Sequence, residues 1–209
     1  MKLLKILMIS LLLAGCGREE VLGQEPREKM TEVIVENQVF KVWYNEIKEQ
    51  PVKLVYTSTD RPKNVDRGSM NFYTEPDYYT SNNADYYRNV WDKGHLAPAA
   101  TYSDSMENLK LTFSYLNCAL QNQYLNRGEW RLLEEQERVW DDEQNLTITV
   151  ELIWEDGYEI LPTDAHVPTH MSKTIYFEKD GNCRKFVFPN EKPTKDWEEY
   201  EVTCTNWYL

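Results

Sequence analysis

The sequence predicts an α+β fold in which a largely antiparallel sheet carries a few helices. Two observations lead to this class. Short runs of β-branched and aromatic residues recur along the chain, as half-buried strands require, and one segment, residues 128–140, is rich in good helix formers. The chain has 209 residues, of which 41% are apolar, and this is enough for one domain with its own core.

Strand patterns occur on both sides of a central region that carries most of the polar motifs. Three short strands are expected early in the domain and three more near its end, at residues 33–35, 39–44, 52–56, 146–154, 174–177 and 185–188. Asp180-Gly181 lies between the last two and is a strong hairpin-turn signal. Residues 60–90 are rich in Asn, Asp, Ser, Pro and Tyr without periodicity, which indicates a long surface loop.

Residues 1–15 have the pattern of a bacterial export signal. Lys2 and Lys5 precede an apolar run that is shorter than the roughly 20 residues a membrane-spanning helix needs. The run ends in Leu13-Ala14-Gly15-Cys16, which is similar to a lipobox and implies cleavage before Cys16 and lipidation of that cysteine. An ordinary secretory signal with a coincidental cysteine is the alternative, and it also leads to export.

Residues 16–30 are charged and lack periodic apolar positions, so we expect a lipidated cysteine and tether here, followed by the folded domain at 31–209. Acyl chains on Cys16 would hold the protein to a membrane, since each buried methylene contributes about 0.8 kcal/mol. The sequence therefore predicts an exported bacterial lipoprotein, anchored on the periplasmic face or the cell surface.

The densest group of reactive residues runs from Trp91 to Arg138. An unperturbed histidine titrates near 6.5 and can accept a proton at neutral pH. An asparagine oxygen suits a magnesium-type ion, and a lysine can face a phosphate. The group contains Asp92-Lys93-Gly94-His95, the amides Asn117, Gln121 and Asn126, and the carboxylate Glu134. These are the groups that hydrolysis of a phosphodiester requires.

This pattern resembles the DNA/RNA non-specific endonuclease family, the ββα-metal or His-Me finger nucleases, over roughly Val39 to Phe188. The resemblance implies a catalytic strand, loop and helix on a largely antiparallel sheet. It also implies metal-dependent cleavage of DNA and RNA without strong sequence preference, with Mg²⁺ as the cofactor and Mn²⁺ as a substitute. DNA and RNA are then the expected partners, together with the membrane through Cys16, and no obligate protein partner is expected.

The resemblance also implies a role for each site residue. His95 corresponds to the general base, Asn126 to the metal ligand, and Glu134 to the residue that organises the waters of the metal. The expected catalytic group is completed by two phosphate-binding cations and two supporting residues, which are Lys93, Arg67, Asp92 and Asn117. Most relatives have Arg at the position of Lys93, so the charge is kept here but the bidentate geometry is lost.

Other interpretations of these residues stay open at this point. A lone histidine is more often structural than catalytic, Asn126 could be a helix N-cap, and Arg67 could be an exposed loop residue. A net charge of −12 has the wrong sign for a broad basic footprint on nucleic acid. A catalytically inactive lipoprotein that serves as a binding module, or a phosphodiesterase for a non-nucleic substrate, would fit the same fold.

The remaining cysteines and histidines suggest two further features. Cys183 and Cys204 could form a disulfide in an oxidising compartment, which requires Cα atoms less than about 7 Å apart, while Cys118 would be buried beside the catalytic strand. His166 and His170 have the i, i+4 spacing of helical metal ligands, but Pro168 between them argues against a helix.

Overall fold

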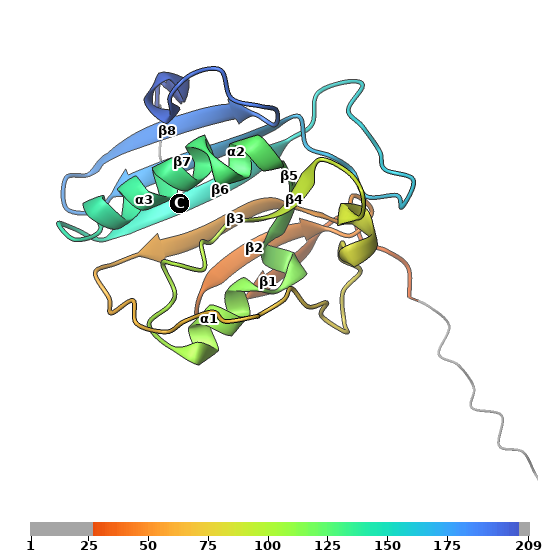
Figure 1. Ribbon diagram of the computed structural model, residues 1–209, viewed down its shortest axis with the longest axis horizontal. Helices are drawn as coiled ribbons and strands as arrows, with labels where there is room; N and C mark the ends of the chain where they lie inside the picture. The colour runs from red at the N-terminus through yellow and green to blue at the C-terminus, as the bar shows by residue number, and fades with distance from the viewer. Residues whose placement is uncertain (1–26, 205–209) are drawn as a thin grey trace, which may run out of the picture.

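A seven-stranded sheet forms the centre of the computed structural model, which describes residues 27–204 (Figure 1). The strands lie in the order β1-β2-β3-β6-β7-β8-β9, and every neighbouring pair is antiparallel. Their bounds are β1 Val33–Glu36, β2 Phe40–Asn45, β3 Gln50–Ser58, β6 Leu146–Ile153, β7 His170–Phe177, β8 Asn182–Pro189 and β9 Glu201–Val202.

All six strands that the sequence predicts are present, and the predicted hairpin connects β7 to β8. Gly181 in that turn has a φ of 67°, a left-handed conformation that glycine adopts without a Cβ clash. β7 begins at His170, four residues before the predicted start at Thr174. The strand pattern did not reveal this extension because polar Ser172 and Lys173 are buried in the fold and interrupt the apolar signal.

A second, two-stranded sheet pairs β4 (Trp91–His95) with β5 (Cys118–Asn122). Helix α1 (Met106–Thr112) lies between these strands in the sequence, and α2 (Gln123–Arg127) and α3 (Glu129–Trp140) follow them. The remaining helical turns are η1 (Asn83–Tyr86), η2 (Tyr115–Asn117) and η3 (Trp197–Tyr200). α3 confirms the helix predicted at 128–140. The predicted loop at 60–90 contains η1 and is otherwise irregular, whereas α1 had no predicted counterpart.

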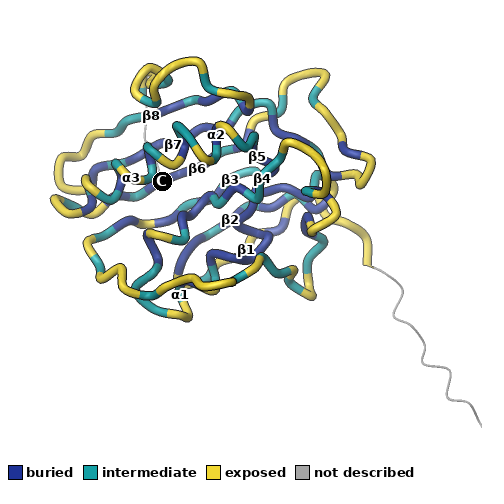
Figure 2. The backbone as a smooth tube through the Cα atoms, viewed as in Figure 1, coloured by how far each residue is buried: buried dark blue, intermediate teal, exposed yellow. Residues whose placement is uncertain are grey.

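Helix α3 packs against one face of the large sheet (Figure 1). Trp130 and Leu133 on this helix are buried in the main core, and the Trp130 ring lies 5.8 Å from the ring of Phe188 on β8. Burial alternates along β2, so one side of this strand faces the core, and Figure 2 shows buried stretches of backbone along the strands of the large sheet. The β4–β5 hairpin contacts this sheet through β3, and α2 packs against both strands of the hairpin.

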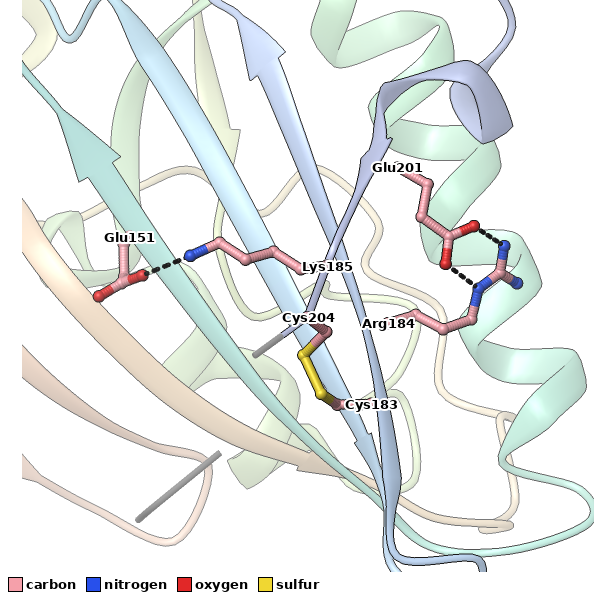
Figure 3. The surroundings of a disulfide bond; sticks show 6 residues. All are labelled: Glu151, Cys183, Arg184, Lys185, Glu201 and Cys204. Carbon is pink, nitrogen blue, oxygen red and sulfur yellow. Dashed lines mark hydrogen bonds and ion pairs between the residues drawn. A yellow bond between two sulfur atoms is a disulfide. The ribbon is translucent and has the colours of Figure 1, made fainter. Parts of the chain in front are cut away.

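Two features secure the ends of the described chain. Cys183 on β8 forms a disulfide with Cys204 and holds the segment around β9 against the sheet, with 6.0 Å between the Cα atoms (Figure 3). This confirms that pair, and Cys118 is free and buried as predicted. At the other end, Arg27 donates a hydrogen bond of 2.7 Å to the buried carboxylate of Glu46, so the last part of the expected tether contacts the domain.

The predicted signal segment, Cys16 and most of the tether lie outside the described residues. Within residues 27–204, none of the helices has the length and hydropathy needed to cross a bilayer.

Candidate active site on the β4–β5 hairpin

The hairpin brings the central motif into one place. β4 carries Asp92, Lys93, Gly94 and His95, and its last residue pairs with Cys118 at the start of β5. Side chains alternate along a strand, so Lys93 and His95 share one face of the hairpin, and Asp92 and Gly94 share the other. The four residues of the motif therefore contact two different sets of neighbours, one on each face of the hairpin.

Glycine at position 94 is required by the packing of the hairpin. A Cβ built on Gly94 would lie 2.7 Å from the Cβ of Gln121, a distance that real Cβ atoms do not show. Gln121 is fully buried and fills this space from β5. Any larger residue at position 94 would therefore separate the two strands.

Two buried amides fasten β5 to the rest of the domain. The side chain of Gln50 on β3 accepts a hydrogen bond of 3.0 Å from the backbone nitrogen of Leu120. Asn190 accepts one of 2.8 Å from the backbone nitrogen of Asn122 and donates one of 2.9 Å to the carbonyl of Leu120. Buried backbone groups of an edge strand need such partners, so the position of the hairpin is fixed from its outer side.

His95 lies among aromatic rings. Its ring centroid is 4.6 Å from that of Phe72 and 5.0 Å from that of Phe113. Burial, together with the positive charge of Arg67, lowers the pKa of His95 to about 3. Its Nε2 is buried and has no hydrogen-bond partner among the described residues. The imidazole is therefore neutral at physiological pH and keeps a ring nitrogen available.

Arg67 reaches the same region from the long loop. Its guanidinium lies 5.8 Å from the centroid of the Phe113 ring, and its charge acts on His95. The residue is exposed, as the loop interpretation requires. The structure thus places Arg67 both on a surface loop and beside the expected base.

Lys93 is enclosed by rings on the same face as His95. Its Nζ lies 5.5 Å from the ring centroid of Tyr115, 5.8 Å from that of Tyr86 and 6.0 Å from that of Phe72. The ammonium donates a hydrogen bond to the side-chain oxygen of Asn83, which also accepts one of 2.9 Å from the Tyr115 hydroxyl. Asn83 therefore fixes the end of the flexible Lys93 side chain.

Asp92 works on the opposite face by holding two residues of α2. Its Oδ2 accepts a hydrogen bond of 3.0 Å from Nδ2 of Asn126, and both of its oxygens accept bonds from Arg127, at 2.7 and 2.6 Å. Asp92 is thus a positioning residue in this structure. The N-cap interpretation of Asn126 is wrong, because Asn122 caps α2 and Gly128 occupies the cap position of α3.

Asn117 is fully buried, and both ends of its side-chain amide are used. Its Oδ1 accepts a hydrogen bond of 2.7 Å from the backbone nitrogen of Ala97, and its Nδ2 donates to the carbonyls of Ala97 and Thr112, at 2.9 and 2.8 Å. These bonds fix the backbone that follows His95. The role that the structure supports for Asn117 is therefore positioning of the chain that follows His95.

Glu134 lies on α3, whereas Asn126 lies on the separate helix α2, so the two residues do not share one helix face. The Glu134 side chain is 14% exposed. Burial raises its pKa to about 7, while the positive charge of Lys173, 3.9 Å away, opposes that rise. Within residues 27–204, no recorded hydrogen bond or ion pair joins Glu134 to the hairpin. The structure thus brings Arg67, Lys93 and His95 together, joins Asp92 to Asn126, and leaves Glu134 oriented by the sheet below it.

The donor set fits a hydrated cation. The nitrogen of the Asn126 amide is anchored to Asp92, and its oxygen has no recorded hydrogen bond within the described part of the chain. No cluster of three or more His, Cys, Asp or Glu side chains suited to a metal occurs among the described residues. One amide oxygen is a suitable ligand for Mg²⁺, which keeps most of its waters, and it is a poor site for zinc.

The sequence analysis gave no site role to three residues that the structure places at the site, which are Asn83, Phe72 and Arg127. Phe72 and Asn83, the first residue of η1, both lie within residues 60–90, where no periodicity indicates which side chains face the domain. Arg127 follows Asn126 directly, and its pairing with Asp92 depends on the packing of α2 against β4. The only available signal was the concentration of polar and aromatic residues in a long loop.

Comparison with known proteins gives consistent results. A family model described as DNA/RNA non-specific endonuclease matches residues 25–207. The mitochondrial nuclease EXOG of Xenopus laevis is 30% identical over 190 residues, which cover 76% of this chain and 51% of that protein. The mitochondrial endonuclease G of Homo sapiens is 31% identical over 128 residues, covering 54% of this chain and 43% of that protein. The chain thus spans about half the length of these curated relatives.

A solved structure shares the fold. A crystal structure of the EndoG/EndoGI complex, which addresses the mechanism of EndoG inhibition, superimposes with a TM-score of 0.74 at 24% sequence identity. The match covers 81% of this chain and 80% of that chain. The predicted α+β architecture with its ββα-metal arrangement is therefore confirmed at the level of the fold.

Proposed function

Because the chain belongs to the DNA/RNA non-specific endonuclease family of hydrolases, we propose that it cleaves phosphodiester bonds of DNA and RNA without strong sequence preference. His95 is the general base and one Mg²⁺ ion, replaceable by Mn²⁺, is the cofactor. The observation that carries this proposal is the neutral, unpartnered Nε2 of His95, within the described chain, beside the cations of Arg67 and Lys93. The family is metal-dependent, and the anchored amide of Asn126 supports a metal position.

The chemistry divides among the residues of the hairpin. His95 takes a proton from the attacking water, for which a neutral imidazole is required. Lys93 and Arg67 offset the negative charge that develops on the phosphoryl oxygens. A cation bound at Asn126 would stabilise the leaving alkoxide.

The negative net charge of the chain fits an enzyme that cleaves and releases nucleic acid better than a protein that holds it tightly. A net charge of −12 opposes tight binding through many phosphate contacts, and a hydrolase needs only local cations at the scissile phosphate. We also propose that the protein is exported and held to a membrane through a lipidated Cys16, on the strength of the Leu13-Ala14-Gly15-Cys16 pattern alone.

Digestion of a supercoiled plasmid and of an RNA, each with and without a chelator, tests this function. We expect cleavage of both by the wild type with Mg²⁺, loss on chelation, and loss in His95→Ala with an unchanged circular dichroism spectrum. Full activity of His95→Ala would overturn the assignment of the base. Absence of any metal-dependent turnover would favour an inactive binding module, and cleavage of small diesters alone would favour a non-nucleic substrate.

A further inference from the structure

Lys173 is a buried cation under the helix that carries Glu134. Its side chain is fully buried, and it projects from β7 toward α3. Its Nζ lies 2.8 Å from Oε1 of Glu137 and 4.3 Å from the centroid of the Trp130 ring. Figure 1 shows α3 lying over the part of the sheet to which β7 belongs. The lysine thus connects the centre of the sheet to three residues of one helix.

A buried lysine is costly, so the fold must compensate for it. Removing an ammonium from water costs several kcal/mol in real proteins, and only well-placed opposite charges offset that cost. Glu134 and Glu137 are three residues apart on α3, where like charges lie on one face and repel each other. Lys173 lies close to both carboxylates, and it is the only cation for which an ion pair with either of them is recorded in the described chain.

The two carboxylates differ in what else they contact. Glu137 is fully buried and accepts a hydrogen bond of 2.6 Å from the hydroxyl of Tyr56, so residues of the sheet lie against both of its oxygens. Glu134 is partly exposed, and its Oε1, 3.9 Å from Lys173, has no hydrogen-bond partner among the described residues. Glu137 therefore neutralises and anchors Lys173, while Glu134 is oriented by the lysine and keeps its hydrogen-bonding capacity.

We propose that Lys173 is a positioning residue of the nuclease, which holds the Glu134 carboxylate at the base of the active site so that it can accept hydrogen bonds from the waters of the bound cation. This inference rests on the proposed function. Lys173 touches neither substrate nor metal and acts through Glu134 alone. No sequence pattern indicated this role, because Lys173 lies just before the strand predicted at 174–177 and a lysine is normally exposed.

A double-mutant cycle between Lys173→Met and Glu134→Gln tests this role, because it isolates the coupling of two neighbouring residues. Methionine retains much of the length of the lysine chain without its charge. We expect Lys173→Met to lower kcat for plasmid cleavage roughly 10- to 100-fold and to weaken Mg²⁺ binding measured by calorimetry by a similar factor, the range typical of residues behind a metal site. KM for nucleic acid should change little.

The decisive comparison is made in the Glu134→Gln background. If Lys173 acts through Glu134, adding Lys173→Met there should change kcat and Mg²⁺ affinity by less than about threefold. Tyr56→Phe is the matched control: it removes the hydrogen bond to Oε2 of Glu137 and leaves the carboxylate that pairs with Lys173, so it should lower the urea midpoint while retaining most of kcat. Lys173→Arg keeps the cation and should retain kcat to within about tenfold of the wild type, and it carries the test if Lys173→Met does not fold.

Two outcomes would overturn the inference. If Lys173→Met caused the same fold-loss of kcat in the wild-type and in the Glu134→Gln background, the lysine would support the fold in general and would not act through Glu134. A loss of activity in Tyr56→Phe as large as in Lys173→Met would have the same meaning. These outcomes differ from failure of the proposed function, in which the wild type itself shows no metal-dependent cleavage and both proposals fall together.

Discussion

The carboxylate of Asp92 determines which way the amide of Asn126 faces. Asn126 donates from Nδ2 to Oδ2 of Asp92 at 3.0 Å, and this leaves its oxygen available. A side-chain amide has one donor end and one acceptor end, so a partner at the donor end fixes the direction of the acceptor. In the proposed metal site, Asp92 would orient the amide oxygen of Asn126 without being a ligand itself.

Asp92→Ala should weaken metal-dependent activity by releasing that amide. We expect the Mg²⁺ concentration for half-maximal plasmid cleavage to rise roughly 10- to 100-fold, as for other residues that orient a metal ligand. Saturating Mg²⁺ should restore much of the rate. Asp142→Ala, at an exposed position after α3, is the control and should leave the titration unchanged. An unaltered Mg²⁺ dependence in Asp92→Ala would contradict the positioning role.

Lys93→Met should reduce cleavage roughly 100- to 1000-fold, the usual cost of removing one group that stabilises charge in the transition state. Lys93→Arg should preserve or raise the rate because the charge stays and the guanidinium offers a bidentate fork. Initial rates on plasmid at saturating Mg²⁺ provide the measurement, with the exposed Lys179→Met as control. A loss of several powers of ten in Lys93→Arg would argue against phosphate binding at this position.

Gly94→Ala should destabilise the hairpin. The added methyl would lie 2.7 Å from Cβ of Gln121, and that atom is attached directly to the backbone, so β5 itself must move. We expect a loss of about 1–3 kcal/mol in the free energy of unfolding, measured in urea. Changing Gln121 to Gly in the same chain removes the contacted atoms and should recover part of that loss. An unchanged urea midpoint for Gly94→Ala would show that the strands separate freely.

Acid should destabilise the domain partly through His95. The folded-state pKa of about 3 lies below the unfolded value of 6.5, so the unfolded chain binds the proton first as the pH falls. The contribution of His95 is thus complete above about pH 6.5 and is lost toward pH 3, with a slope of at most roughly 1.4 kcal/mol per pH unit. Urea unfolding of the wild type and of His95→Gln can be measured from about pH 7 to pH 4 with a chelator present. The free energy of unfolding should fall more steeply with decreasing pH in the wild type. Parallel declines would show that His95 is not the group responsible.

Reduction of the Cys183–Cys204 bond should loosen the last described segment. The bond spans 21 residues, for which loop-closure entropy gives about 3 kcal/mol of stabilisation. Cys183→Ser with Cys204→Ser, or addition of reductant to the wild type, should lower the free energy of unfolding by a similar amount. Cys118→Ser keeps the disulfide and should retain the response to reductant. Equal stability with and without reductant would show that β9 needs no cross-link.

Local patterns predicted much of this architecture. β-branched runs marked six of the strands, Asp180-Gly181 marked the hairpin between β7 and β8, and the composition of 128–140 marked α3. Each of these signals depends on the conformational preferences of residues that are close in the chain, so the element can be predicted from the sequence. The motif that contains His95, Asn126 and Glu134 resembled a known family, and membership of that family is confirmed.

Only the tertiary structure decided what each of these side chains faces. Asp92 binds Asn126 across 34 residues, and Gln50 holds Leu120 across 70. Lys173 and Glu137 meet between a strand and a helix that the sequence treats as separate elements. Such contacts depend on the packing of distant segments, and the lowered pKa of His95 depends on its burial among the rings that this packing brings together. Sequence thus determined the fold and the chemical groups, whereas long-range packing determined their orientation and charge.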